Sequence, residues 1–165
     1  MKISGIIRKI IYIAAAVLIV AVDQITKVIA GNVFKEDSVP VIKNVFYFVY
    51  TENTGAAFSM FSGKKWLLIG FVSIVMAVML YLLISDRIKN KLFEAGLWMA
   101  VAGGIGNLID RIIKGYVVDF IYFSPINFPV FNVADIFITV GAGILLLSLI
   151  LDIAKEKNKN TAKSE

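Results

Sequence analysis

Two aspartates, Asp119 and Asp135, have the surroundings that best suit chemistry. Asp119 lies in the apolar run Tyr-Val-Val-Asp-Phe-Ile-Tyr-Phe, and removing a carboxyl group from water raises its pKa. Asp135 lies close to a predicted helix start, where backbone N–H groups and the helix dipole stabilise the ionised form. An aspartic-protease pair requires one protonated and one ionised acid, which share a proton and polarise a water molecule. Taken alone, Asp135 is more simply interpreted as a helix-capping acid.

The residue types that are absent exclude several other kinds of catalysis. The 165-residue sequence contains no cysteine and no histidine, which removes disulfides, thiol nucleophiles, Ser-His-Asp triads and the usual zinc sites. A serine–lysine peptidase needs neither residue, but its candidates, Ser59, Ser62 and Lys64, lie in a predicted loop where such residues are usually solvated. The non-enzyme alternative is a proton-coupled transporter or an assembly factor, with the acids forming a relay. Against it, the charges gather at one membrane face instead of crossing the membrane.

Further polar residues gather toward the same predicted membrane face, where each of them carries an energetic cost. Asp23 and Lys27 are four residues apart, so they share a helix face and can form an ion pair; we interpret Lys27 as structural. Asn107, Asp110 and Arg111 share another helix face, and Arg111 can pair internally or hold a lipid phosphate or a substrate carbonyl. Helix packing alone gives no reason for polar residues to choose one face. The polar residues that accompany the two aspartates there are Asp23, Lys27, Asn53, Asn107, Asp110, Arg111 and Asn132.

Four hydrophobic stretches must carry these residues. The sequence is 59% hydrophobic with a mean hydropathy of +0.83, and a membrane helix needs about 20 mostly apolar residues. The first stretch is interpreted as a retained helix and not as a secretory signal, because it is long and lacks a clear small-residue cleavage site. Gly103, Gly104 and Gly106 in the third stretch favour close helix packing. The predicted helices cover residues of about 10–30, 66–84, 92–112 and 133–153.

Lysine and arginine residues set the orientation of the chain in the membrane. Basic residues precede the first span, join the second to the third and follow the fourth, which puts ten of the 17 lysines and arginines on one side. Both termini are therefore predicted to be cytoplasmic, with the polar cluster near the extracytoplasmic face. The basic clusters favour anionic inner-leaflet lipids and explain the net charge of +5 without nucleic acid. These ten residues are Lys2, Arg8, Lys9, Arg87, Lys89, Lys91, Lys155, Lys157, Lys159 and Lys163. The rule is not clean, because four lysines fall in the first outer loop: Lys35, Lys43, Lys64 and Lys65.

The first outer segment, residues 31–65, is predicted to form a small sheet at the membrane surface. Its run 44–51 is rich in aromatic and β-branched residues, which are enriched in strands. Residues 53–55 read as a turn, and residues 57–61 as a second short strand.

The second outer segment, residues 114–132, is predicted to be a partly irregular interfacial loop because it contains Pro125 and Pro129. Four of its aromatic residues can hold acyl chains or form a simple interfacial belt: Tyr116, Phe120, Tyr122 and Phe123. The polar tail 155–165 is expected to fray. We therefore predict a single domain over residues 1–165, an all-α membrane protein with four transmembrane helices, a small extracytoplasmic β-sheet and an interfacial loop.

At five blocks the sequence resembles lipoprotein signal peptidase (signal peptidase II), the bacterial family of intramembrane aspartyl peptidases. The blocks follow the family's order between residues 23 and 135, and all five together are highly specific. The four-helix layout extends the resemblance to nearly the whole chain. One departure is Phe128, because a tryptophan is often found just before the proline of the last block. The five blocks are Asp23-Gln-Ile-Thr-Lys27, Asn53-Thr-Gly-Ala-Ala-Phe58, Gly103-Gly-Ile-Gly-Asn-Leu-Ile-Asp-Arg111, Gly115-Tyr-Val-Val-Asp-Phe120 and Phe131-Asn-Val-Ala-Asp135.

The resemblance implies an activity, partners and a set of site residues. It implies an aspartyl endopeptidase that removes the signal peptide from diacylglyceryl-modified prolipoproteins by cleaving before the lipidated cysteine, with Asp119 and Asp135 as the catalytic pair. No metal or cofactor is implied. The implied partners are the prolipoprotein substrates, membrane lipids and globomycin-type inhibitors, for a monomeric enzyme of the bacterial cytoplasmic (inner) membrane. The implied supporting residues are Asp23, Asn53, Asn107, Asp110, Arg111, Asn132 and Ala134.

Overall fold

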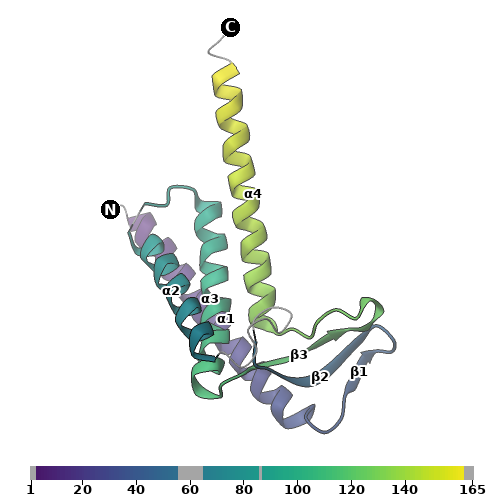
Figure 1. Ribbon diagram of the computed structural model, residues 1–165. Coiled ribbons are helices and arrows are strands. Elements are labelled where there is room, and N and C mark those ends of the chain that lie inside the picture. The colour runs from purple at the N-terminus through teal and green to yellow at the C-terminus, as the bar shows by residue number, and fades with distance from the viewer. Residues whose placement is uncertain (1–2, 56–64, 86, 162–165) are drawn as a thin grey trace.

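Four long helices and a three-stranded antiparallel sheet form the protein (Figure 1). The computed structural model describes residues 3–55, 65–85 and 87–161. Each of the four helices is long and apolar enough to cross a membrane, and the sheet lies at one end of the bundle, beside the end of the first helix and the start of the last (Figure 1). The predicted fold class is therefore confirmed. The helices are α1 (Ile3–Val33), α2 (Lys65–Ile84), α3 (Lys91–Ile113) and α4 (Val133–Thr161), and the strands are β1 (Val39–Ile42), β2 (Phe46–Asn53) and β3 (Val117–Phe123).

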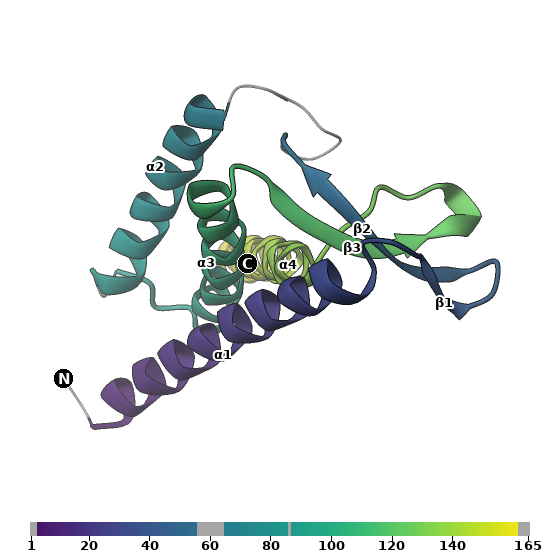
Figure 2. The ribbon, with the colours of Figure 1, turned by 90° about the horizontal axis from the view of Figure 1, so that it is seen from below.

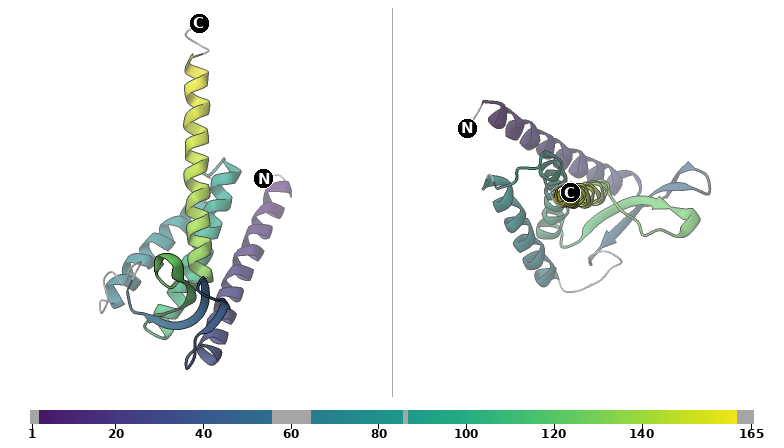
Figure 3. Two further views of the ribbon diagram at one scale, coloured as in Figure 1. Left: turned by 90° about the vertical axis from the view of Figure 1, so that its right-hand side faces the viewer. Right: turned by 90° about the horizontal axis from the view of Figure 1, so that it is seen from above.

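Helix α3 is the central helix of the bundle. It packs against α1, α2 and α4, most extensively against α4, and the other three helices surround it in Figures 2 and 3. More than half of the most apolar stretch of α3 is buried, whereas only about a tenth or less of the corresponding stretches of the other helices is buried. Exposed apolar faces of this length match the hydrocarbon core of a bilayer. The helix that carries Asn107, Asp110 and Arg111 is thus shielded by the three that face the surroundings.

Three glycines of α3 allow the other helices to approach closely. A Cβ atom at Gly103 would collide with the backbone at the start of α4. A Cβ atom at Gly104 would lie 2.5 Å from the sulfur of Met76 in α2, and one at Gly106 would lie 2.5 Å from Oδ2 of Asp23 in α1. Each glycine therefore serves a different neighbouring helix, which confirms the prediction of close packing by small residues.

Residues 114–132 were predicted to be a partly irregular interfacial loop, and the prediction was wrong for residues 117–123, which form the regular strand β3. The strand pairs antiparallel with β2, in a register that sets Asp119 opposite Thr51, while β1 pairs with the other edge of β2. Its residues are β-branched and aromatic, which favours a strand, and Val118 and Phe120 are buried against the end of α1. The prolines that suggested a loop follow the strand. After one 3₁₀ turn, the chain leading to α4 is irregular, as predicted.

The hydrogen bond expected of a turn at residues 53–55 is present. Oδ1 of Asn53 accepts the N–H of Gly55 at 3.0 Å. The second strand predicted over 57–61 lies outside the described residues. The same is true of the alternative serine–lysine candidates, which are Ser59, Ser62 and Lys64.

Two helices are longer than the apolar stretches that predicted them. Helix α1 begins at Ile3 instead of residue 10, and α4 continues to Thr161 instead of ending near residue 153. The tail expected to fray from residue 155 is therefore helical over most of its length, and Figure 1 shows it projecting well beyond the other helices. Lysine and glutamate are good helix formers, and extending an existing helix requires no new nucleus.

Two polar contacts join the helices at the end of the bundle opposite the sheet. Nε of Arg8 in α1 lies 3.0 Å from Oε2 of the buried Glu94 in α3. Nδ2 of Asn90 donates to Oδ2 of Asp152 in α4 at 2.8 Å, while Oδ1 of Asn90 caps α3 by accepting the N–H groups of its first turn. These contacts fasten α1 and α4 to α3 far from the sheet.

Candidate active site

Asp119 lies in the middle of β3 with its side chain turned into the end of the bundle. The residue is only 2% exposed. Its Oδ2 accepts the Nδ2 of Asn53 at 2.9 Å, and its Oδ1 accepts the Nδ2 of Asn132 at 2.6 Å. Burial, followed by the negative charge of Asp135, raises the pKa of Asp119 to about 6, although the two amide hydrogen bonds act in the opposite direction. The apolar sequence around this residue predicted the direction of the shift.

Asp135 occupies the third position of α4, where it forms a capping box with Asn132. The N–H of Asp135 donates to Oδ1 of Asn132 at 3.0 Å, and the N–H of Asn132 donates to Oδ2 of Asp135 at 3.2 Å. The other carboxylate oxygen, Oδ1, accepts the Nδ2 of Asn107 at 2.8 Å. The helix-capping interpretation of Asp135 is thus confirmed, and the same carboxylate also faces the polar cluster.

A single asparagine, Asn132, connects the two aspartates. Its Oδ1 is occupied by the N–H of Asp135, so chemistry requires that Nδ2 be the atom that faces Asp119. Asn132 is completely buried, and its Nδ2 also lies 3.1 Å from Oδ1 of Asn107. Asp119 on the sheet and Asp135 on α4 are therefore held by one amide with no freedom to turn.

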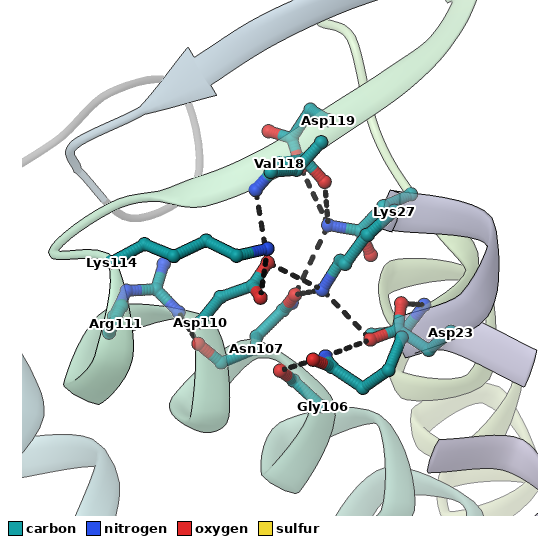
Figure 4. Close-up of polar contacts among 12 residues, drawn as sticks. Asp23, Lys27, Gly106, Asn107, Asp110, Arg111, Lys114, Val118 and Asp119 are labelled. Atoms are coloured by element: carbon teal, nitrogen blue, oxygen red, sulfur yellow. Dashed lines mark hydrogen bonds and ion pairs between the residues drawn. The ribbon is translucent and has the colours of Figure 1, made fainter. Parts of the chain in front are cut away.

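Lys27 lies between two buried acids, Asp23 and Asp110 (Figure 4). Nζ of Lys27 lies 2.8 Å from Oδ2 of Asp23 and 3.3 Å from Oδ2 of Asp110, and all three side chains are fully buried. The predicted ion pair between Asp23 and Lys27 is confirmed. Oδ1 of Asp23 accepts the N–H of Ala134 at 2.9 Å, and Oδ2 of Asp110 accepts the N–H of Val118 at 3.1 Å. Both acids therefore hold backbone that leads into the candidate pair.

Arg111 pairs internally, through backbone oxygens. Its Nη2 donates to the carbonyl of Gly55 at 2.8 Å, and its Nη1 donates to the carbonyl of Asn107 at 3.3 Å. Its Nε has no hydrogen-bond partner among the described residues. The guanidinium thus fastens the end of β2 to α3, and it lines the cavity described next.

A cavity of about 730 Å³ brings Asp119 and Asp135 to one surface. Its polar end also contains Asn53, Asn107 and Arg111. The strands contribute Thr51, Glu52 and Val117. The rest of the lining is mainly apolar and comes from α4 and the segment just before it: Phe128, Pro129, Val130, Phe131, Ile136, Ile138, Thr139 and Val140. A concave site with apolar walls and a few converging polar groups is typical of a binding or active site.

The aromatic residues expected to hold acyl chains do not line this cavity. Phe120 packs against Phe48 and Phe123 against Phe46, with ring centroids 6.2 Å and 5.1 Å apart. Tyr116 and Tyr122 similarly face tyrosines of β2. Cross-strand aromatic pairs stabilise a sheet. These contacts with aromatic residues of β2 could not be predicted, because the sequence of this segment predicted a loop and not a strand.

Sequence reasoning missed several contributors, although some had a local signal. Nζ of Lys114 lies 3.0 Å from Oδ1 of Asp110. Lys114 is four residues beyond Asp110, a spacing that predicts an ion pair on a helix. Ile136 and Thr139 line the cavity. Thr139 is four residues after Asp135 and so shares its helix face, whereas no spacing signal pointed to Ile136. Among the described residues, no group of acids is arranged to hold a metal ion.

Comparison with known proteins gives one consistent result. Residues 15–151 match the family described as signal peptidase (SPase) II. The lipoprotein signal peptidase of Halalkalibacterium halodurans is 38% identical over 155 residues, covering 92% of this chain and 99% of that protein. That of Brevibacillus brevis is 38% identical over 147 residues, covering 88% of this chain and 99% of that protein. A solved structure of a bacterial membrane enzyme superposes with a TM-score of 0.81 at 33% identity, covering 87% of this chain and 90% of the other.

Proposed function

The chain belongs to the signal peptidase (SPase) II family, and on this premise we propose that it is an aspartyl endopeptidase of prolipoproteins. The substrate is a prolipoprotein whose cysteine carries diacylglycerol, and the enzyme cleaves the peptide bond just before that cysteine. The observation that carries the proposal is that Asp119 and Asp135 line one cavity and are held by one shared asparagine, Asn132. Two carboxyl groups that share a proton can activate water without a metal or a cofactor.

In the proposed reaction the two aspartates have different roles. Both oxygens of Asp135 accept N–H groups, which stabilises a carboxylate, so Asp135 takes a proton from the water that attacks the scissile carbonyl carbon. Asp119, whose pKa is raised to about 6, gives its proton to the carbonyl oxygen. The C–N bond of the resulting tetrahedral intermediate then breaks as its nitrogen receives the proton from Asp135. As the carbonyl re-forms, one hydroxyl of the intermediate returns its proton to Asp119, which restores the starting state of the pair. The two groups titrate as a pair, so these roles describe the state of the pair at each step.

The proposed substrate matches the walls and the position of the cavity. The diacylglyceryl chains anchor the substrate in the membrane and bring its cleavage site to the membrane surface. The apolar wall from α4, with Ile136, Ile138 and Val140, suits the lipid or the apolar signal peptide. We place both termini in the cytoplasm and the site near the extracytoplasmic face, because the basic clusters follow the distribution of lysine and arginine in cytoplasmic loops.

The test is cleavage of a diacylglyceryl-modified lipobox peptide by the purified protein in detergent. We expect Asp119→Asn and Asp135→Asn each to lower kcat by about 1,000-fold or more, because each removes an ionisable oxygen while keeping the side-chain size. Asp37→Asn, in the exposed segment after α1, is the matched control and should retain wild-type turnover.

Three results would contradict parts of this proposal. Near-normal turnover by a folded Asp119→Asn or Asp135→Asn variant would show that the catalytic pair is wrong, and Asp110 would be tested next. Loss of activity on replacing Ser59 and Ser62 with alanine would favour the serine–lysine alternative. A wild-type protein that does not cleave the peptide but carries ions across reconstituted vesicles would favour the transporter.

A further inference from the structure

The ammonium group of Lys27 has more partners than an ion pair between helices needs. It lies 2.8 Å from Asp23 and 3.3 Å from Asp110, and it donates to Oδ1 of Asn107 at 2.8 Å (Figure 4). An ammonium has three N–H donors and no acceptor, so every donor of Lys27 is matched to one partner. The side chain is fully buried, and a buried charge is retained only where its surroundings compensate it well.

Both acids that pair with Lys27 hold the backbone immediately before a candidate catalytic residue. Asp23 accepts the N–H of Ala134 at 2.9 Å, one residue before Asp135. Asp110 accepts the N–H of Val118 at 3.1 Å, one residue before Asp119. The starts of α4 and β3 are therefore each tied to a carboxylate, and Lys27 contacts both carboxylates.

Lys27 is the nearer of two donors that fix which way the amide of Asn107 points. Because the ammonium only donates, the atom of Asn107 that faces it must be the oxygen. The nitrogen of Asn107 is thereby turned toward Oδ1 of Asp135, to which it donates at 2.8 Å. Without Lys27, Nδ2 of Asn132 would be the remaining donor to Oδ1 of Asn107, at 3.1 Å. The oxygen of Asn107 would then have lost its shorter hydrogen bond, and the amide could shift away from Oδ1 of Asp135.

We infer that Lys27 is a positioning residue for the reaction, which acts through Asn107 on Asp135 and through two buried carboxylates on the spacing of the aspartate pair. The inference rests on the proposed function, because it assumes that Asp119 and Asp135 do the chemistry. It replaces the purely structural role that the spacing of Asp23 and Lys27 suggested.

The main test is a double-mutant cycle of Lys27→Met with Asn107→Ala, read as kcat and KM for the lipobox peptide. Lys27→Met alone is expected to lower kcat by about 100-fold, as a misplaced catalytic group does, while KM changes by less than about threefold. In the Asn107→Ala background, the same change should lower kcat by at least about fivefold less than it does in the wild type, because the route through Asn107 is already lost and only the route through the two carboxylates remains. Losses that multiply, or a wild-type kcat for Lys27→Met, would overturn the inference.

A second variant separates positioning from loss of the fold. Lys27→Met leaves Asp23 buried without its closest cation, whereas Lys27→Met/Asp23→Asn removes both charges and keeps an oxygen that can accept the N–H of Ala134. We expect this double variant to have a Tm close to that of the wild type and still to show the loss in kcat. A wild-type kcat would mean that Lys27 only neutralises Asp23, and the inference would be wrong.

The ion pair at the opposite end of the bundle provides the matched control. Arg8 and Glu94 also join α1 to α3, at 3.0 Å, but they contact neither aspartate. Arg8→Met/Glu94→Gln should therefore lower the Tm and leave kcat unchanged. A loss of kcat equal to that of Lys27→Met would show that any link between these helices has the same effect, which would overturn the specific role of Lys27.

Parallel assays of Asp119→Asn and Asp135→Asn distinguish failure of the inference from failure of the proposed function. If these variants cleave normally, the proposed function fails and the role of Lys27 fails with it. If they are inactive while Lys27→Met has wild-type kinetics, only the inference about Lys27 is wrong.

Discussion

At the scale of single residues, the site depends on three asparagines that have the same arrangement. Asn53, Asn107 and Asn132 each direct the side-chain nitrogen at one of the candidate catalytic carboxylates. In each case the side-chain oxygen is occupied by a donor elsewhere: the N–H of Gly55, the ammonium of Lys27 or the N–H of Asp135. An asparagine amide is a directional donor only while its orientation is fixed, and here all three orientations are fixed.

Asn53 offers a test of this arrangement through the pH dependence of the reaction. Its hydrogen bond to Asp119 stabilises the ionised carboxylate and so keeps the pKa of Asp119 lower than burial alone would set it. Asn53→Ala removes that bond, and the pKa of Asp119 should therefore rise further above about 6. If Asp119 must start protonated, the basic limb of the kcat/KM profile moves to higher pH by about one unit. Asn158→Ala, on the exposed end of α4, should leave the profile in place; a basic limb that moves to lower pH in Asn53→Ala would refute the role given to Asp119.

At the scale of elements, the sequence predicted the helices better than the strands. A run of about 20 apolar residues has few alternatives to a membrane helix, so all four helices could be located. Strand β3 could not, because an apolar segment followed by prolines reads equally well as an irregular interfacial loop, and its partner β2 is more than 60 residues away. Local spacing revealed the pair of Asp23 and Lys27. It could not reveal that Asp23 holds the N–H of Ala134, which comes from a different helix 111 positions along the chain.

The contact of α3 with α4 at Gly103 gives a prediction at this scale. A methyl group there would push against the backbone at the start of α4, which carries Asp135. Gly103→Ala should therefore lower both the Tm and, by at least about tenfold, kcat. Gly70→Ala is the matched control, because a Cβ atom at Gly70 would meet nothing within 4 Å and alanine favours a helix more than glycine does. Equal effects of the two substitutions on kcat would show that the close contact of α3 with α4 at Gly103 is not what positions Asp135.

At the scale of the whole molecule, the two ends of the bundle have different tasks. One end contains the sheet, the cavity and the buried polar network, while the other contains the contacts of Arg8 with Glu94 and of Asn90 with Asp152. The sequence predicted that the polar residues would gather at one end, because their distances from the ends of the apolar stretches can be counted. The wall that α4 contributes to the cavity could not be predicted, since it depends on how the last helix is rotated against α3.

The proposed orientation of the molecule can be tested by chemical labelling, because the sequence contains no cysteine. We expect Asp37→Cys, beside the sheet, to react with a membrane-impermeant maleimide in spheroplasts or protoplasts, whose cytoplasmic membrane is intact. Asn158→Cys, on the far end of α4, should react only after the membrane is opened. Both positions are exposed in the folded protein, so burial does not account for a difference. The reverse pattern would place the cavity on the cytoplasmic side.

The capping box at the start of α4 has a consequence for the working enzyme. The carboxylate of Asp135 that holds the N–H of Asn132 is the same one that takes a proton from water in the proposed reaction. A protonated carboxyl group is a weaker acceptor and loses its favourable interaction with the helix dipole. In the proposed reaction, each turnover would therefore loosen the first turn of α4 while Asp135 is protonated, and the turn would tighten when the proton leaves with the product. The first turn of α4 would thus open and close once in each catalytic cycle.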